Sequence, residues 1–180
     1  TLGIMGGLSI LGTSGLVIPC SSEAYVETIR MLLQGARELG SDTAVLVTGS
    51  QSQEVARSRY PVLPEVAIVR IGDHIRMSIE YARDLGFSRI VVGCMPGKLS
   101  KFARGLDYTH ARESTLSLGE LADDLAARGF PAPVIDACRR SATVQGFLDD
   151  VEAAQRRAVM EEWAGRALNV WKAWAPAVRF

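Results

Sequence analysis

The stretch that decides the fold covers residues 66–98, VAIVRIGDHIRMSIEYARDLGFSRIVVGCMPGK. It begins with an apolar run that ends at Gly72, continues with apolar residues at helical spacing, and closes with a second apolar run before Gly93. Runs that are apolar throughout are typical of strands covered on both faces, as in a parallel sheet. A strand, a helix and a second strand in this order predict a βαβ unit.

The same pattern continues on the N-terminal side of this unit. Residues 44–47 form another apolar run and residues 16–18 a shorter one, and the spacing between them predicts a helix that starts at Ser21 or Ser22 and ends before Gly40. Four apolar runs that alternate with helices predict an α/β fold, with a mostly parallel, Rossmann-like sheet covered by helices.

The pattern changes after this region, and the remaining chain is expected to be a helical C-terminal region. Apolar spacing predicts one helix that ends at Gly129 and a long helical region from about Ser141, while residues 134–137 are expected to form a brief strand or a turn. The three tryptophans are expected to pack this layer onto the sheet: Trp163, Trp171 and Trp174.

Length and composition limit the classes of protein that this chain can belong to. With 180 residues, we expect an α/β ligand-binding core over residues 1–130 and a helical region over residues 131–180 that packs on the same domain. Twenty basic and twenty acidic side chains cancel, so no global field attracts nucleic acid or a membrane surface. No apolar run approaches the roughly 18 residues of a membrane span. We therefore expect a cytoplasmic protein.

A structural metal site is not expected. The three cysteines are widely spaced, no pair has the CxxC spacing, and the chain holds only two histidines. Structural zinc sites usually need four closely patterned cysteine and histidine ligands.

Polar and small residues follow the predicted strands, where ligands bind in parallel sheets. These residues are Thr48, Gly49, Ser50, Gly72, Asp73, His74 and residues 94–98. Asp73 is placed to cap the helix that follows it, and it is also a candidate polar site residue. The sequence therefore predicts a ligand site at the carboxyl ends of the strands.

A basic segment follows the last predicted strand. Its cations are Lys98, Lys101, Arg104 and Arg112. Only Asp107 opposes them locally, which leaves either a solvated helix face or a patch for an anionic ligand. His110 lies in the same segment, and a histidine there can donate a hydrogen bond or move a proton near neutral pH.

Six segments occur in one order along the chain and together point to a known family. They are GGLSILGTSGLVIP from Gly6, VLVTG from Val45, IGDHI from Ile71, LGFSRIVVG from Leu85, PGKLSKFARG from Pro96 and THAR from Thr109. In this order they resemble the CbiD family, the cobalt-precorrin-5B C1-methyltransferases of anaerobic cobalamin biosynthesis. The resemblance covers roughly residues 1–130.

The resemblance implies S-adenosylmethionine as methyl donor and a cobalt-bearing tetrapyrrole as acceptor. It places the donor near Gly6, Gly7, Ser9, Gly12, Thr13, Gly15, Thr48, Gly49 and Gly72. It places the carboxylates of the acceptor near Lys98, Lys101, Arg104, Thr109 and Arg112. His110 and Asp73 are then expected to orient the acceptor or to accept a proton.

Members of the family carry a further N-terminal domain, so the resemblance implies that such a domain or a partner chain completes the site. It leaves open whether the chain forms a homo-oligomer. Two other functions stay open at this point: a non-catalytic corrinoid-binding module, and an unrelated α/β enzyme that acts on a small anionic substrate.

Overall fold

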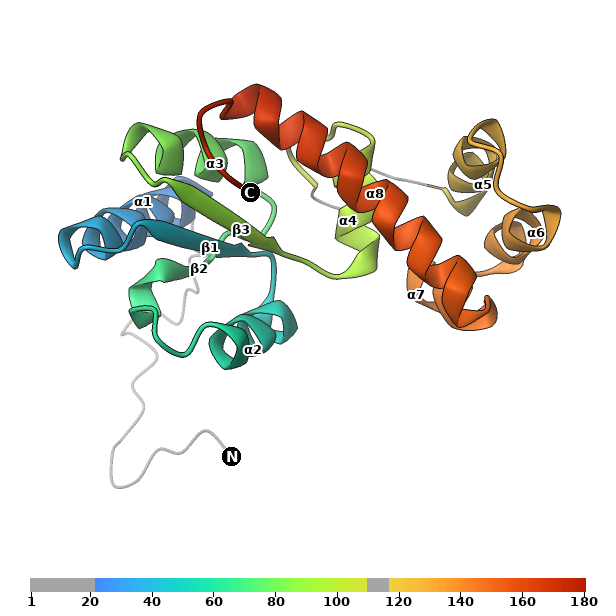
Figure 1. Ribbon diagram of the computed structural model, residues 1–180, viewed down its shortest axis with the longest axis horizontal. Coiled ribbons are helices and arrows are strands. Elements are labelled where there is room, and N and C mark those ends of the chain that lie inside the picture. Colours follow the sequence, from blue (N-terminus) through green and yellow to red (C-terminus); the bar gives the residue numbers. More distant parts are fainter. Residues whose placement is uncertain (1–21, 110–116) are drawn as a thin grey trace, which may run out of the picture.

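A three-stranded parallel sheet forms the centre of the α/β part of the chain (Figure 1). The computed structural model describes residues 22–109 and 117–180. The strands are β1 (Thr43–Val47), β2 (Ile68–Arg70) and β3 (Arg89–Gly93), in the spatial order β2-β1-β3. Val45 of β1 lies opposite Ile68 of β2 and Val91 of β3. The predicted α/β fold with a parallel sheet is thereby confirmed.

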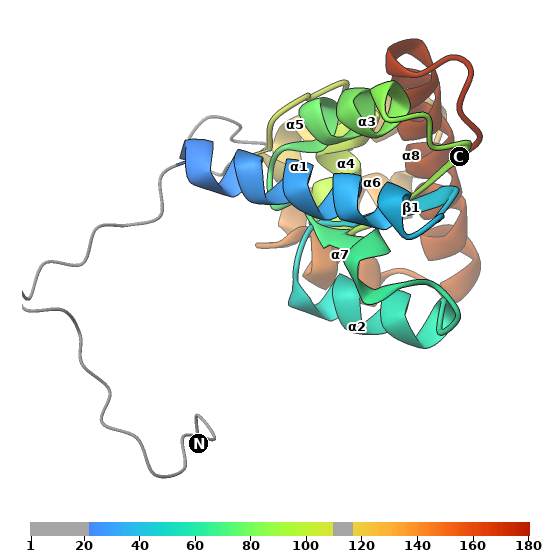
Figure 2. The same cartoon turned by 90° about the vertical axis from the view of Figure 1, so that its left-hand side faces the viewer.

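Helices connect the strands and cover both faces of the sheet. The helices of this part are α1 (Ser22–Glu38), α2 (Ser50–Arg59), the short 3-10 helix η1 (Glu65–Ala67) and α3 (Ile75–Asp84). Figure 1 and the turned view in Figure 2 place α1 and α3 on one side of the sheet and α2 on the other. Gly40 and Gly86 follow α1 and α3 with φ of 81° and 78°, the left-handed conformation that glycine commonly adopts at the end of a helix. The sequence predicts the first of these ends.

The side chains of β1 alternate between two buried clusters. Ala44 and Leu46 belong to the large cluster under α1 and α3, whereas Val45 and Val47 belong to the small cluster under α2. Both sets are almost fully shielded from solvent. Burial on both faces explains why this strand is apolar at every position from 44 to 47.

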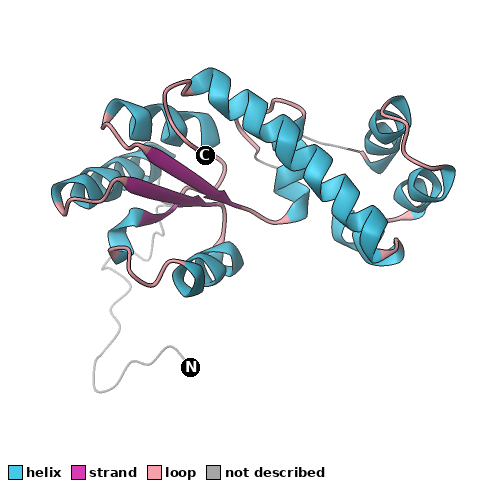
Figure 3. Cartoon of the chain, viewed as in Figure 1, coloured by secondary structure: helices cyan, strands magenta, loops and turns pink. Residues whose placement is uncertain are grey.

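Within the described part of the chain, five further helices follow β3, and Figure 3 shows that this region is helical. They are α4 (Pro96–Ala103), α5 (Leu118–Ala127), α6 (Ala132–Arg140), α7 (Val144–Asp150) and α8 (Ala153–Trp174). The long helix α8 packs against α4 and α3. No helix within residues 22–109 and 117–180 has both the length and the apolar character that a membrane crossing requires.

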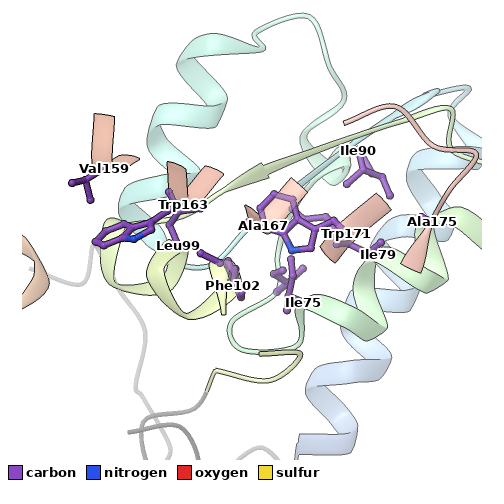
Figure 4. Close-up of a cluster of buried hydrophobic side chains, with 14 of the residues drawn as sticks. Ile75, Ile79, Ile90, Leu99, Phe102, Val159, Trp163, Ala167, Trp171 and Ala175 are labelled. Atoms are coloured by element: carbon purple, nitrogen blue, oxygen red, sulfur yellow. The ribbon is translucent and has the colours of Figure 1, made fainter. Parts of the chain in front are cut away.

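Two tryptophans of α8 join these helices to the rest of the core (Figure 4). The Trp163 ring lies 6.5 Å from that of Phe147 on α7, and the Trp171 ring lies 5.7 Å from that of Phe102 on α4. Both tryptophans are buried, while Trp174 is half-buried under the guanidinium of Arg76. The expected packing role of the tryptophans is confirmed for the first two.

The structure corrects three details of the sequence prediction. Residues 134–137 are neither strand nor turn but lie inside α6, because the two prolines before them occupy the start of a helix, where no amide donor is needed. The long helical region from Ser141 is two helices, since the backbone is extended at Val151 between α7 and α8. The apolar run at residues 66–71 forms a strand only over Ile68–Arg70.

The end of the chain returns to the sheet, which the sequence did not indicate. The amide of Ile90 donates to the carbonyl oxygen of Arg179 at 2.8 Å, and the amide of Arg179 donates to that of Ser88 at 3.1 Å. Residue 179 thus covers part of the outer edge of β3. The apolar run at residues 16–18 lies outside the described residues.

Candidate functional site

A hollow of about 630 Å³ lies beyond the carboxyl ends of the strands. Its walls come from the loop after β2, the start of α4, the segment after α4, and the start of α7. The lining residues are Asp73, Met95, Pro96, Gly97, Lys98, Ser100, Lys101, Thr109, Thr143, Val144 and Gln145. The predicted position of the site, at the carboxyl ends of β2 and β3, therefore coincides with a pocket of a size typical of small-molecule sites.

Asp73, Lys98 and Thr109 form one hydrogen-bonded group in this hollow. The Lys98 Nζ forms an ion pair with Asp73 Oδ1 and donates to Thr109 Oγ1 at 2.9 Å. The Thr109 hydroxyl donates to Asp73 Oδ1 at 2.8 Å. Thr109 is only 1% exposed, whereas the side chains of Lys98 and Asp73 are 29% and 22% exposed. The buried hydroxyl therefore fixes two charged groups that still reach the pocket.

This arrangement overturns the prediction that Asp73 caps α3. The helix is capped by His74, and no side chain donates or accepts at that cap. The Asp73 carboxylate faces Lys98 and Thr109 instead, because an ammonium group is a stronger partner for it than a neutral backbone amide. These partners are distant in sequence, so local spacing gave no sign of them.

Lys101 brings a second ammonium group to the same point. Its Nζ donates to the carbonyl oxygen of Thr109 at 3.1 Å, and Lys98 approaches that oxygen at 3.5 Å. Burial and, after it, the positive charge of Lys98 lower the pKa of Lys101, which Asp73 partly counteracts. Among the described lining residues, two cations and one carboxylate give a net positive charge, which favours an anionic ligand.

An aromatic group lies behind Asp73. The His74 ring is 5.8 Å from that of Tyr25 and 5.1 Å from that of Tyr108, and burial lowers the pKa of His74 against the opposing effect of Asp73. Gly72 has φ of 56°, and a Cβ on it would lie 3.3 Å from the Tyr25 ring. The glycine thus allows the tyrosine to pack closely over the loop after β2.

The other described candidates lie away from the hollow. The Thr48 amide donates to the Gly93 carbonyl oxygen at 3.0 Å, and the Gly49 amide donates to Ser52 Oγ at 3.1 Å. Gly72 packs under Tyr25, as described above. None of these three residues lines the hollow.

Arg104 points to a different partner. Its guanidinium lies 3.8 Å from the carboxylate of Glu120 on α5, and the residue does not line the hollow. Asp107 lies 3.7 Å from Arg76. The local charge balance that the sequence suggested is therefore wrong for the folded chain, because Asp73 and Glu120 come from outside the basic segment.

Several candidates lie outside the described residues. They are Gly6, Gly7, Ser9, Gly12, Thr13, Gly15, His110 and Arg112. Their proposed roles stay predictions.

Sequence reasoning missed the wall that α7 contributes. Thr143 begins this helix, its hydroxyl accepting from the amide of Gly146 at 3.0 Å, and Val144 and Gln145 follow it into the lining. A threonine before a helix is a recognisable start signal, but nothing local to it indicates which pocket the helix faces. Among the described residues, no group of three or more His, Cys, Asp or Glu side chains is placed to hold a metal ion.

The fold and the hollow define an α/β protein with a parallel sheet and a pocket at the carboxyl ends of its strands, where two lysines and one aspartate meet. No family model matches the chain, and no solved structure matches it. The cobalt-precorrin-5B C(1)-methyltransferase of Variovorax paradoxus (strain S110) is 41% identical over 144 residues, covering 80% of this chain and 40% of the relative. Those of Nitratidesulfovibrio vulgaris and Geobacillus kaustophilus, with the same name, are 38% and 35% identical over 181 and 153 residues.

By this similarity the chain belongs to the cobalt-precorrin-5B C(1)-methyltransferase family, as the six sequence segments predicted. It spans less than half the length of these curated relatives, between 40% and 46%. The match to the Nitratidesulfovibrio vulgaris protein covers 94% of the chain, so the similarity continues into the helices beyond residue 130. The six segments that carry the resemblance all lie before residue 130.

Proposed function

We propose that this chain contributes the acceptor-binding part of an S-adenosylmethionine-dependent methyltransferase that methylates C1 of a cobalt-precorrin in anaerobic cobalamin biosynthesis. The names of the relatives support the reaction, and the cationic hollow supports the acceptor. The acceptor is a large ring whose edge carries many carboxylates.

The observation that carries this proposal is the convergence of Lys98 and Lys101 on Thr109 beside a hollow of about 630 Å³. Ammonium groups pair with carboxylates through charge-assisted hydrogen bonds. Because Asp73 and Thr109 hold Lys98 in place, little side-chain freedom is lost when a carboxylate binds. Two fixed contacts at the edge of the ring would set its orientation.

In this reaction the protein mainly has to hold the donor and the acceptor in the right orientation. When bound, the donor supplies a methyl group on a sulfonium, and the sulfur keeps the electron pair of the broken bond while a ring carbon of the acceptor provides the pair of the new bond. Lys98 and Lys101 would hold the ring edge, and Asp73 would act through Lys98 as a positioning residue. The methylated ring then loses a proton, and we propose that His110 or water accepts it.

The described residues that we expected near the donor fit it poorly. The Thr48 and Gly49 amides already donate to Gly93 and Ser52, and Gly72 lies under the Tyr25 ring. These backbone groups are therefore engaged within the fold.

A second function is favoured by one observation: the amides of Thr48 and Gly49, which we expected near the donor, are engaged within the fold. A chain that holds the acceptor without the rest of the active site would be a corrinoid-binding module. Incubation with S-adenosylmethionine and a cobalt-precorrin separates the two functions: methyl transfer by the chain alone supports the enzyme, and binding without transfer supports the module.

Cobyrinic acid, whose peripheral groups are free carboxylates, is the probe for the acceptor site, with cobinamide, its amidated counterpart, as the control ligand. Replacing Lys98 and Lys101 together by alanine should weaken the affinity for cobyrinic acid about tenfold, since each partly exposed ion pair contributes about 0.5–1 kcal/mol. The affinity of this double variant for cobyrinic acid should also depend less on the salt concentration than that of the parent chain.

The matched control is the double variant Lys172→Ala and Arg157→Ala. It removes the same charge from exposed positions on α8 that do not line the hollow. The assignment of the acceptor site would be overturned if the parent chain, the double variant and the control bound cobyrinic acid with the same affinity and the same salt dependence. It would also be overturned if the parent chain bound cobinamide as tightly as cobyrinic acid.

A further inference from the structure

A groove runs along the outer edge of β3, the edge strand of the sheet (Figure 1). It consists of two hollows of about 600 Å³ and 340 Å³, the first bordered by α2 and the second by α8. The two hollows meet along the strand, because both are lined by Tyr60, Val91, Val92 and Cys94. None of these four residues lines the hollow of the acceptor site. We call this surface the edge groove.

The backbone of β3 presents unpaired hydrogen-bonding groups to the edge groove. Successive residues of a strand direct their amide and carbonyl groups to opposite edges. The carbonyl oxygen of Gly93 points inward and accepts from Thr48, whereas the amide of Ile90 points outward and donates to Arg179. Val92 lies two residues after Ile90, so its amide and carbonyl groups also point outward. Among the described residues, no backbone group on that side pairs with Val92.

Residue 179 shows how a further strand can pair with this edge. It forms a parallel bridge with Arg89, since its amide donates to Ser88 and its carbonyl oxygen accepts from Ile90. Within the described residues the pairing goes no further, which leaves the half of β3 beyond Ile90 with an open edge. Open edges with unpaired amide and carbonyl groups accept an added strand.

The walls of the edge groove are apolar. Val91 and Val92 are half-buried, Val55 on α2 is 66% exposed, and Leu168 on α8 lines the other hollow. Burial raises the pKa of the Cys94 thiol to about 12, so this thiol is neutral and adds to the apolar lining. The side chains of an added strand would point alternately into the two hollows. Exposed apolar surface of this kind is typical of contacts between proteins.

Positive charge gathers where β3 begins. The guanidinium of Arg89 lies 5.9 Å from the centre of the Tyr60 ring, Arg59 precedes Tyr60 at the end of α2, and Arg179 is bridged to Arg89. Among the described residues, none of these three guanidiniums has an ion-pair partner. Glu54, the acid of α2, lies more than one helical turn before Arg59. This end of the edge groove therefore favours acidic residues in a partner.

We propose that the edge groove binds an extended polypeptide segment of a partner protein, which adds a strand to the sheet beside β3. The backbone of this segment pairs with Val92, and its apolar side chains at alternate positions fill the two hollows. Acidic residues at one of its ends lie beside Arg59, Arg89 and Arg179. The inference goes beyond the proposed function, and none of its contacts involves the two lysines of the acceptor site.

The test starts from a phage-displayed library of random peptides of about ten residues, long enough to span the five residues of β3, selected on the immobilised chain. The proposal predicts that the enriched peptides carry apolar residues at alternate positions and acidic residues at one end. Enrichment of peptides with apolar residues at helical spacing would overturn it, and so would the absence of any enrichment.

Synthetic copies of the strongest peptide test the backbone pairing, with the affinity measured by fluorescence anisotropy. In an added strand, every second amide points to β3 and the others point to solvent. N-methylation of one alternate set of amides should therefore abolish binding, whereas N-methylation of the other set should leave the affinity almost unchanged. Equal effects of the two sets would contradict the addition of a strand.

A charge placed in the edge groove tests where the peptide binds. Val55→Asp should weaken the peptide affinity about tenfold or more, because the charge would lie against apolar side chains of the peptide. The control is Val62→Asp, at a position 90% exposed that lines neither hollow, and it should bind the peptide as the parent chain does. Equal affinities of the two variants would overturn the proposal. Circular dichroism checks the fold of each variant.

The acidic end of the peptide is tested by Arg59→Gln combined with Arg179→Gln. This double variant should weaken the peptide affinity about threefold, since exposed ion pairs contribute little each. The double variant Lys172→Ala and Arg157→Ala removes the same charge elsewhere and should have no effect. Equal affinities in these two double variants would contradict the predicted orientation of the partner. Cobyrinic acid should bind all these variants as it binds the parent chain, so the outcome is independent of the acceptor site.

Discussion

Replacing Thr109 with valine should destabilise the fold and weaken the acceptor site together. The two side chains have nearly the same shape, so the change removes one hydroxyl at a position that is 1% exposed. That hydroxyl accepts from Lys98 at 2.9 Å and donates to Asp73 at 2.8 Å. Each hydrogen bond to a charged group contributes about 1.5–3 kcal/mol when its partner would otherwise be unsatisfied.

The expected loss is smaller than the sum of these two contributions. Lys98 and Asp73 stay paired with each other, and their side chains are 29% and 22% exposed, so water replaces part of what is lost. We therefore expect the free energy of unfolding to fall by about 1.5–2 kcal/mol. In a chain of this size that corresponds to a melting temperature lower by about 3–8 °C.

Urea unfolding followed by tryptophan fluorescence measures this loss, since Trp163 and Trp171 are buried. The matched control is Thr28→Val on α1, where an exposed hydroxyl donates only to the carbonyl oxygen of Ala24, and its effect should stay within about 0.5 kcal/mol. Cobyrinic acid should bind more weakly to Thr109→Val, and Thr109→Ser should restore part of that affinity. A Thr109→Val chain as stable as the control variant would refute the reasoning.

The remaining predictions concern pH and two glycines. Burial lowers the pKa of His74 below its usual 6.5, so the unfolded chain binds the proton more readily, and the free energy of unfolding should fall as the pH drops through 6.5. His74→Gln should flatten that dependence between pH 7 and 5, and an identical slope in parent and variant would contradict it. Gly72→Ala should destabilise the chain by about 1 kcal/mol or more, because φ is 56° and the Tyr25 ring lies close. Gly165→Ala, inside α8 with open space around it, should stabilise it by about 0.5–1 kcal/mol; thermal melts that rank the two variants in the opposite order would exclude this account.

Local patterns in the sequence were enough to predict the sheet and the position of the site. The run at residues 44–47 is buried on both faces, and this alone marks it as a strand of a covered parallel sheet. Since all three strands are parallel, their carboxyl ends share one edge, so Asp73 and Lys98 could be placed together without knowledge of their contact.

What could not be predicted depends on contacts between residues far apart in sequence. The Asp73 carboxylate has its partners on α4 and after it, and Arg104 has its partner on α5. The wall formed by Val144 and Gln145 exists only because α7 packs against α4.

The most direct test of the central claim is hydrogen–deuterium exchange of the chain with and without saturating cobyrinic acid. The account predicts protection at the start of α4, around Thr109 and at the start of α7, with α2 unchanged. Protection confined to other elements, or no protection at a concentration where binding is independently measured, would contradict the claim that this hollow holds the acceptor.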